Sequence, residues 1–172
     1  IDIVCTINEA NLTACFAHSF QSYPENGMKA IMPFIKDAAE ECGSTLENFG
    51  PFLFGHPFKI RDCMMEAHVK SVPIIKSILN NNQPVGVTLS IMDYQAAEGG
   101  EKVRDQAYAE SVDCCLDQVI NDDFVGVQMY TRHTYGPDGI IKPKADDPNM
   151  LVMGYEYYPE SLENVVRYVS SK

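Results

Sequence analysis

Two short segments with strictly alternating residues constrain the fold of this chain more than any other feature. In residues 84–91 (PVGVTLSI) and 124–131 (FVGVQMYT), aliphatic side chains occupy every second position. Successive side chains of a β-strand point to opposite faces, so a strand with this pattern must bury its aliphatic face. Each segment is therefore predicted to be a strand. The aliphatic positions are Val85, Val87 and Leu89 in the first segment, and Val125, Val127 and Met129 in the second.

The order of the other elements indicates parallel strands. Residues 1–7 also favour a strand, and a stretch with helical periodicity precedes each alternating segment. The predicted order is strand, helices, strand, helix, strand, helix, which is typical of β/α winding around a parallel sheet. The helices are predicted at 26–42, 61–80 and 102–120, and after Pro159.

The second face of the two alternating segments narrows the fold class further. It carries mainly glycine and small polar residues, although parallel strands normally have apolar faces on both sides. The inside of a closed (β/α)₈ barrel accounts for this pattern, because its inward face becomes polar towards the catalytic rim. A complete barrel needs about 250 residues, and this chain has 172. We therefore predict an α/β fold, a partial TIM barrel of about three β/α units, with 1–172 as one partial domain.

Composition argues against several partner classes. The net charge is −11, with 24 acidic and 13 basic residues, so a nucleic-acid partner is not expected. The sequence contains no apolar run long enough to cross a bilayer, and no membrane partner is expected. The six cysteines form no C-x-x-C pair and four of them lie in apolar periodic stretches, which favours buried free thiols and a cytoplasmic location. The four histidines lack metal-ligand spacing, so neither a metal nor another cofactor is expected.

Polar residues follow all three predicted strands. They are Asn8 and Glu9, then Ser90 to Asp93, then Gln128 to Tyr130. Catalytic groups of a barrel lie where its strands end, so these side chains should meet at one rim. By position alone, Glu9 is equally well interpreted as a helix N-terminal charge or a solvated loop residue. Asp93 is better interpreted as a turn residue than as a second catalytic carboxylate.

Four segments lie in order along the chain: CTINEAN, MMEAHVKSVPIIKSILNNNQPVGVTLSI, DDFVGVQMYTR and MGYEYYPESLENVVRYV. Together they resemble glycoside hydrolase family 1, the β-glucosidase family of (β/α)₈ barrels. CTINEAN is similar to the T-x-N-E-P segment of that family, and DDFVGVQMYTR is similar to D-F-L-G-[IV]-N-Y-Y-T-R. MGYEYYPESLENVVRYV resembles M-G-W-E-I-Y-P-E-G-L and the helix that follows it. MMEAHVKSVPIIKSILNNNQPVGVTLSI resembles an Ala-His helix followed by an I-G-I-T-L-N strand. The matches lie in the family's order and imply that the chain spans about strands 4 to 6 of such a barrel.

The resemblance implies a retaining O-glycosyl hydrolase that acts on β-glycosides, with two carboxylates about 5 Å apart. Glu9 matches the general acid/base, and Asn8 matches the residue that binds the sugar 2-hydroxyl. Tyr130 matches a tyrosine that hydrogen-bonds the nucleophile, and Tyr155 replaces a tryptophan on the aglycone side. Gln128 stands at the asparagine of N-Y-Y and keeps its amide.

The sequence also departs from the family pattern. Ala10 replaces the proline of N-E-P, Ser90 the asparagine of I-T-L-N, and Met129 the first tyrosine of N-Y-Y. The T-E-N-G segment that carries the nucleophile is absent, and PENG at 24–27 lies in a different part of the chain. The chain alone is therefore predicted to be inactive. The alternative hypothesis is a non-catalytic half-barrel that binds carbohydrate, self-associates or pairs with complementing barrel segments through its open strand edges.

Overall fold

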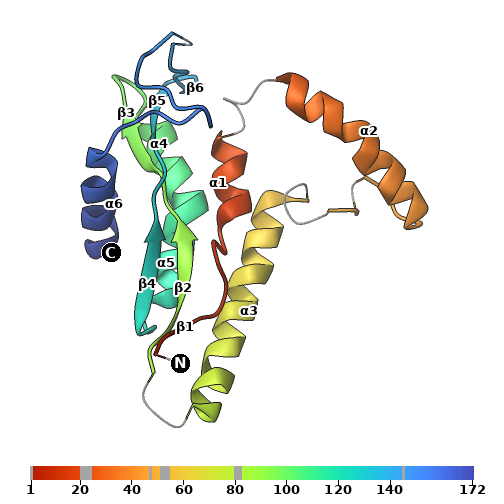
Figure 1. Ribbon diagram of the computed structural model, residues 1–172, viewed down its shortest axis with the longest axis vertical. Coiled ribbons are helices and arrows are strands. Elements are labelled where there is room, and N and C mark those ends of the chain that lie inside the picture. Colours follow the sequence, from red (N-terminus) through yellow and green to blue (C-terminus); the bar gives the residue numbers. More distant parts are fainter. Residues whose placement is uncertain (1, 20–24, 47, 51–54, 80–82, 145) are drawn as a thin grey trace.

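The computed structural model describes residues 2–19, 25–46, 48–50, 55–79, 83–144 and 146–172. Its centre is a parallel sheet in the order β1-β2-β4, formed by β1 (Val4–Cys5), β2 (Val85–Ser90) and β4 (Phe124–Gln128). Figure 1 shows these strands running side by side in the middle of the molecule. Among the described residues, no helix is long and apolar enough to cross a membrane.

A second sheet continues from the carboxyl ends of β2 and β4. Its order is β3-β5-β6, with β3 (Asp93–Ala96) parallel to β5 (Arg132–Gly136) and β6 (Gly139–Ile140) antiparallel to β5. Only two residues separate β2 from β3, so the same chain direction is kept across both sheets. This second sheet was not predicted, and Asp93, expected in a turn, instead begins β3.

Helices lie behind the strands and on both sides of them, and α2 extends away from the rest of the molecule (Figure 1). The segment predicted as a helix over 102–120 forms α4, a π-helical turn η2 and α5, which together run without interruption. The first helix, α1, was not predicted at all. The helices are α1 (Leu12–Ser19), α2 (Glu25–Glu41), α3 (Pro57–Ile78), α4 (Glu101–Tyr108), η2 (Ala109–Asp113), α5 (Cys114–Val119) and α6 (Glu160–Ser170).

The aliphatic face of β2 is buried as predicted, and Gly86 and Ser90 on its other face are buried as well. Val85, Val87 and Leu89 are all fully buried, and they belong to or border the core that extends under α4, α5 and α6. Val125 and Val127 of β4 pack against the same core from a partly buried position. The aliphatic faces of both strands therefore point towards the helices, as predicted.

Other predictions need correction at their ends. The strand expected over 1–7 is reduced to β1, and α3 begins at Pro57 rather than at residue 61. The side chain of His56 caps α3 by accepting from Lys59 N, and Pro57 suits the first helical position, because its missing N–H would have no partner there. α3 also continues through Pro73, where a kink or shift was expected.

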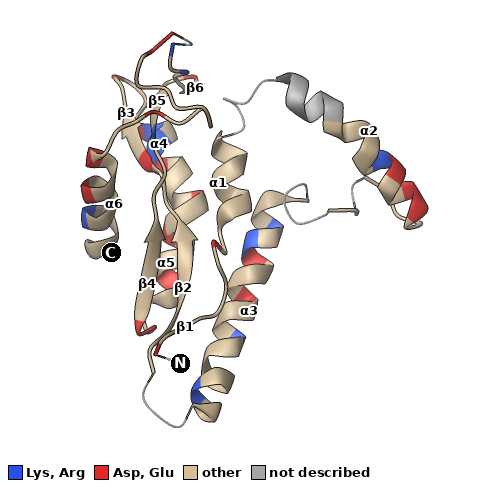
Figure 2. Cartoon of the chain, viewed as in Figure 1, with Lys and Arg blue, Asp and Glu red and all other residues tan. Residues whose placement is uncertain are grey.

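The cysteines differ in their exposure to solvent. All six cysteines are free, but Cys5, Cys42 and Cys63 are exposed, so the expectation that these thiols are buried is only partly right. Figure 2 shows that acidic residues outnumber basic ones along the described parts of α2 and α6, whereas α3 carries more basic than acidic residues.

Candidate active site

The chain turns sharply at Glu9, directly after the first strand. Glu9 has a positive φ of 52°, a conformation that side chains other than glycine rarely adopt. Its backbone N–H donates to Thr88 Oγ1 at 3.0 Å, which ties the turn to β2. Strained backbone of this kind costs about 1–3 kcal/mol and persists only where the surroundings enforce it.

Asn11 enforces this turn from inside the protein. Its side chain is fully buried and forms two hydrogen bonds with the backbone of Ser90, one to the carbonyl and one from the N–H, both 2.8 Å long. Asn11 Nδ2 also donates to the carbonyl of Ser111 at 2.8 Å. The segment that carries Glu9 is thereby fixed to β2 and to the helix behind it.

Three polar side chains meet beside Glu9 at the carboxyl ends of the strands. Gln128 Nε2 lies 2.6 Å from Asn8 Oδ1 and 2.9 Å from Thr88 Oγ1, and Thr88 donates to Asn8 at 3.1 Å. Asn8 and Gln128 come from opposite edges of the parallel sheet, and Thr88 from its central strand. The sheet order therefore brings together residues that are 120 positions apart in the sequence.

Tyr130 completes this network. Its hydroxyl donates to Glu9 Oε1 at 2.8 Å and lies at the same distance from Gln128 Oε1. Burial raises the pKa of Tyr130 to about 12, and the hydrogen bond to the Glu9 carboxylate adds to this increase. The phenol is therefore protonated at neutral pH and can act as a donor to Glu9.

Tyr155 forms an aromatic wall next to Tyr130. The two rings are stacked, with their centroids 6.0 Å apart and their planes inclined by 30°. Flat aromatic faces of this kind bind apolar groups with little loss of side-chain entropy. This side of the site can hold an apolar or ring-shaped group.

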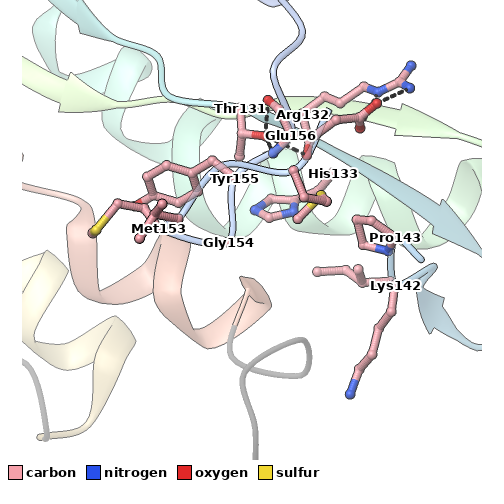
Figure 3. A pocket seen from close by; sticks show the side chains of 12 residues that line it. Thr131, Arg132, His133, Lys142, Pro143, Met153, Gly154, Tyr155 and Glu156 are labelled. Atoms are coloured by element: carbon pink, nitrogen blue, oxygen red, sulfur yellow. Dashed lines mark hydrogen bonds and ion pairs between the residues drawn. The ribbon is translucent and has the colours of Figure 1, made fainter. Parts of the chain in front are cut away.

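A pocket of about 380 Å³ lies on the other side of Tyr155, between β5–β6 and the segment that leads to α6 (Figure 3). Its lining is largely apolar, and His133 contributes an imidazole whose Nε2 lies 3.2 Å from Ser19 Oγ. Burial lowers the pKa of His133 to about 4, so the ring is neutral at pH 7. Glu9 does not line this pocket.

The structure thus brings all five predicted site residues to one rim. Asn8, Glu9, Gln128 and Tyr130 share hydrogen bonds, and Tyr155 stacks on Tyr130. Sequence reasoning missed Thr88 and Asn11 as parts of the site. Thr88 could have been predicted as a site residue, because it lies on the polar face of an alternating strand. No pattern in the local sequence indicates such a role for Asn11.

Asp93 is engaged elsewhere. Its carboxylate accepts from Gln95 Nε2 at 2.8 Å and from Asn164 Nδ2 at 2.9 Å, and the residue is 4% exposed. These contacts give it a structural role between β3 and α6. Among the described residues, no group of three or more His, Cys, Asp or Glu side chains could hold a metal ion.

Comparison with solved structures identifies proteins of similar fold. The chain superimposes on the crystal structure of beta-glycosidase BGL167 with a TM-score of 0.80 and 30% identity, over 99% of this chain and 40% of that one. For the apo structure of a beta-glucosidase 1317, the TM-score is 0.76 and the identity 25%, again over 99% and 40%. A hyperthermophilic beta-glucosidase mutant gives a TM-score of 0.60 at 20% identity, over 99% and 36%, which shows the fold alone.

The chain therefore has a mixed α/β fold with parallel strands that matches part of a glycosidase barrel, and it spans about two fifths of the length of the first two structures. No protein-family model and no curated protein matches the sequence.

Proposed function

We propose that this chain carries the acid/base part of the active site of a retaining β-glycosidase of glycoside hydrolase family 1. In this proposal residues 1–172 form one partial domain, about three β/α units of a TIM barrel. The observation that carries the proposal is the contact of Tyr130 with Glu9, beside Asn8, at the carboxyl ends of parallel strands. The similarity of the fold to solved β-glucosidases supports it.

Glu9 would act as general acid and then as general base. Its carboxylic acid would donate a proton to the leaving glycosidic oxygen, and the resulting carboxylate would accept a proton from the water that attacks the glycosyl intermediate. Asn8 and Gln128 offer amide groups to sugar hydroxyls, and such contacts accelerate the reaction where they strengthen in the transition state. Tyr155 would bound the side that receives the leaving group.

The role of Tyr130 differs in detail from the one that the resemblance implies. Its hydroxyl has one proton, and in this structure that proton is available to Glu9 or Gln128. A second carboxylate entering the site would compete for it. We infer that Tyr130 would turn from Glu9 to that carboxylate when the catalytic pair is complete.

A retaining mechanism needs this second carboxylate as a nucleophile. The present sequence contains no T-E-N-G segment to supply it. We therefore expect the chain alone to hydrolyse β-glycosides negligibly. The substrate, a β-glucoside or phospho-β-glucoside, would be cleaved only when the remaining strands are present. The six free cysteines favour the cytoplasm as the site of this activity.

Hydrolysis of an aryl β-glucoside by a hybrid enzyme tests this proposal. In the hybrid, this chain replaces the matching 40% of beta-glycosidase BGL167, whose own remainder supplies the other strands. We expect the hybrid to be active and Glu9→Gln to reduce kcat by at least about 100-fold, because the loss of a general acid typically costs 10²–10⁴. The exposed Glu98 offers the matched control, Glu98→Gln, which should keep full activity.

The alternative, a non-catalytic carbohydrate-binding or self-associating half-barrel, draws on a different observation. β1 and β4 lie at the two edges of the parallel sheet and present unpaired backbone groups. A folded hybrid that binds the glucoside but does not cleave it, with or without Glu9, would favour this alternative over the catalytic proposal.

A further inference from the structure

The segment that carries Tyr155 is a hairpin-like loop with an exposed tip. We call residues Asn149–Tyr157 the rim loop. Its two arms are joined by hydrogen bonds from Leu151 N to Tyr155 O at 2.8 Å and from Tyr157 N to Asn149 O at 2.7 Å. Gly154 makes the turn with a φ of 77°. The loop is thus closed on itself, and its position on the protein depends on its attachments elsewhere.

Packing gives the tip of the rim loop little support. Leu151, Val152 and Met153 are 50%, 106% and 70% exposed. The pocket of about 380 Å³ lies between the loop and β5–β6, so the loop does not press against the strands below it (Figure 3). Buried apolar contacts, which fix most loops of this size, are scarce here.

The attachment lies instead at Glu156, the residue next to Tyr155. Thr131 Oγ1 accepts from Glu156 N at 3.0 Å and lies 3.2 Å from Glu156 O, so this hydroxyl binds both backbone groups of one residue. Arg132 binds the Glu156 carboxylate through two parallel bonds, from Nε at 2.8 Å and from Nη2 at 2.6 Å. Paired bonds of this geometry fix orientation as well as distance.

Further contacts hold Arg132 in place. Its Nη1 donates to Gln95 Oε1 at 3.2 Å, and its guanidinium lies over the ring of Tyr158 with 3.9 Å to the centroid. Thr131 is 2% exposed, and the side chains of Arg132 and Glu156 are 28% and 15% exposed. The ion pair is therefore shielded from water on most sides. Because the effective dielectric constant is lower there, the pair is stronger than one on the open surface.

The two ends of this contact are adjacent in sequence to the two stacked tyrosines. Thr131 and Arg132 directly follow Tyr130, and Glu156 directly follows Tyr155. We propose that Thr131 and Arg132 are positioning residues, which hold Tyr155 against Tyr130 through Glu156 and so set the aromatic wall of the site. These contacts support the positioning of Tyr155 whatever the ligand is, whereas its importance for a glycoside rests on the function proposed above.

The test uses an indole as a local reporter. The chain has no tryptophan, so Tyr155→Trp introduces a single indole at the position in question. In that background, Arg132→Gln and Thr131→Val should shift the emission maximum to longer wavelength and increase quenching by acrylamide, because the released loop exposes the ring. Arg132→Lys keeps the charge but not the paired bonds, and it should restore the emission only in part.

Arg167→Gln is the matched control, since Arg167 pairs with Glu163 on the exposed surface of α6. It should leave the emission unchanged, and far-ultraviolet circular dichroism should show that each variant is folded. If Arg132→Gln does not fold, Thr131→Val alone tests the positioning role, because it removes one hydroxyl and keeps the side-chain shape. Emission and quenching that stay the same in folded Arg132→Gln and Thr131→Val would overturn the proposal.

The same samples separate this inference from the proposed function. Addition of a nitrophenyl thio-β-glucoside, which resists hydrolysis, should quench the indole in the Tyr155→Trp chain and do so less in the Arg132→Gln variant. Emission changes on substitution without any quenching by the thioglucoside would support the positioning role and count against a glycoside site.

Discussion

Glu9 shows how a single residue can be both strained and well supported. Its positive φ is held from two directions, by the bond of its own N–H to Thr88 and by the buried side chain of Asn11. The location of Glu9 and Asn8 at a strand end could be predicted from the sequence. The support from Asn11 could not, because it depends on a contact with Ser90, 79 positions away, that leaves no local pattern.

The contact between Tyr130 and Glu9 leads to a titration prediction. Burial contributes most to the high pKa of Tyr130, and the Glu9 carboxylate contributes next. Glu9→Gln removes the negative charge but not the burial, so the pKa of Tyr130 should fall below about 12 and stay above its ordinary value of 10. Carbon-13 NMR of labelled tyrosine, assigned by comparison with Tyr130→Phe, measures this change. An unchanged titration in Glu9→Gln would mean that the two side chains do not interact in solution.

His133 predicts how stability depends on pH. Burial lowers its pKa from 6.5 to about 4, so between these values the unfolded chain binds more protons than the folded one. The free energy of unfolding should therefore fall as the pH drops from about 6.5 to about 4. At about 1.4 kcal/mol per pKa unit, the loss approaches about 3 kcal/mol.

Urea unfolding at pH 7 and pH 4 measures this effect, with His133→Gln as the comparison. Carboxylates titrate in both proteins, so the difference between the two proteins isolates His133. The variant should lose less stability than the parent over this range. Equal losses would show that His133 is solvated in the folded state.

Among the elements, the central strands were the most predictable part of the fold. Their alternation indicated which face carries the aliphatic core, and Val85, Val87 and Leu89 are buried as predicted, although the other face of β2 is largely buried too. The second sheet escaped prediction because β3 (DYQA) shows no apolar alternation and is stabilised by its pairing with β5. Such pairing depends on where β2 and β4 already lie, and this information is not present in the four residues themselves.

Gly86 sets how closely β2 and β4 approach. A Cβ on Gly86 would lie 2.1 Å from the carbonyl oxygen of Phe124 and 2.9 Å from its ring. Gly86→Ala should therefore lower the free energy of unfolding by at least about 2 kcal/mol, because backbone must move to admit the methyl group. Gly43→Ala, where a Cβ meets nothing within 4 Å, should cost only about 1 kcal/mol from its positive φ. Urea unfolding compares the two, and equal costs would contradict this account of strand packing.

At the scale of the whole molecule, the similarity to glycosidases covers nearly all of this chain but about two fifths of theirs. The class of fold was predictable because strand order and inward polarity are encoded in short segments. The catalytic pair of the proposed mechanism is incomplete in this chain, because no segment of the sequence matches the one that carries the second carboxylate. This chain therefore supplies the half of the proposed site around Glu9.

Two edge strands and exposed apolar side chains on α6 predict that the chain associates with itself. β1 and β4 are edge strands, and α6 leaves Leu162 53% and Val166 45% exposed. Sedimentation velocity should show an apparent mass that rises with protein concentration. The double substitution Leu162→Glu and Val166→Glu should reduce this rise. The control Glu163→Gln, on the same helix, should leave the rise unchanged. A chain that stays monomeric at every concentration would contradict this expectation.

Chemical rescue of a Glu9 variant tests whether Glu9 is the acid/base residue. In the hybrid enzyme described above, Glu9→Ala should be almost inactive towards an aryl β-glucoside with a good leaving group. Azide needs no general base to attack a glycosyl intermediate, so its addition should restore turnover and yield the β-glycosyl azide with retained configuration. A folded Glu9→Ala hybrid that keeps its activity, or one in which azide restores nothing, would contradict the assignment of Glu9.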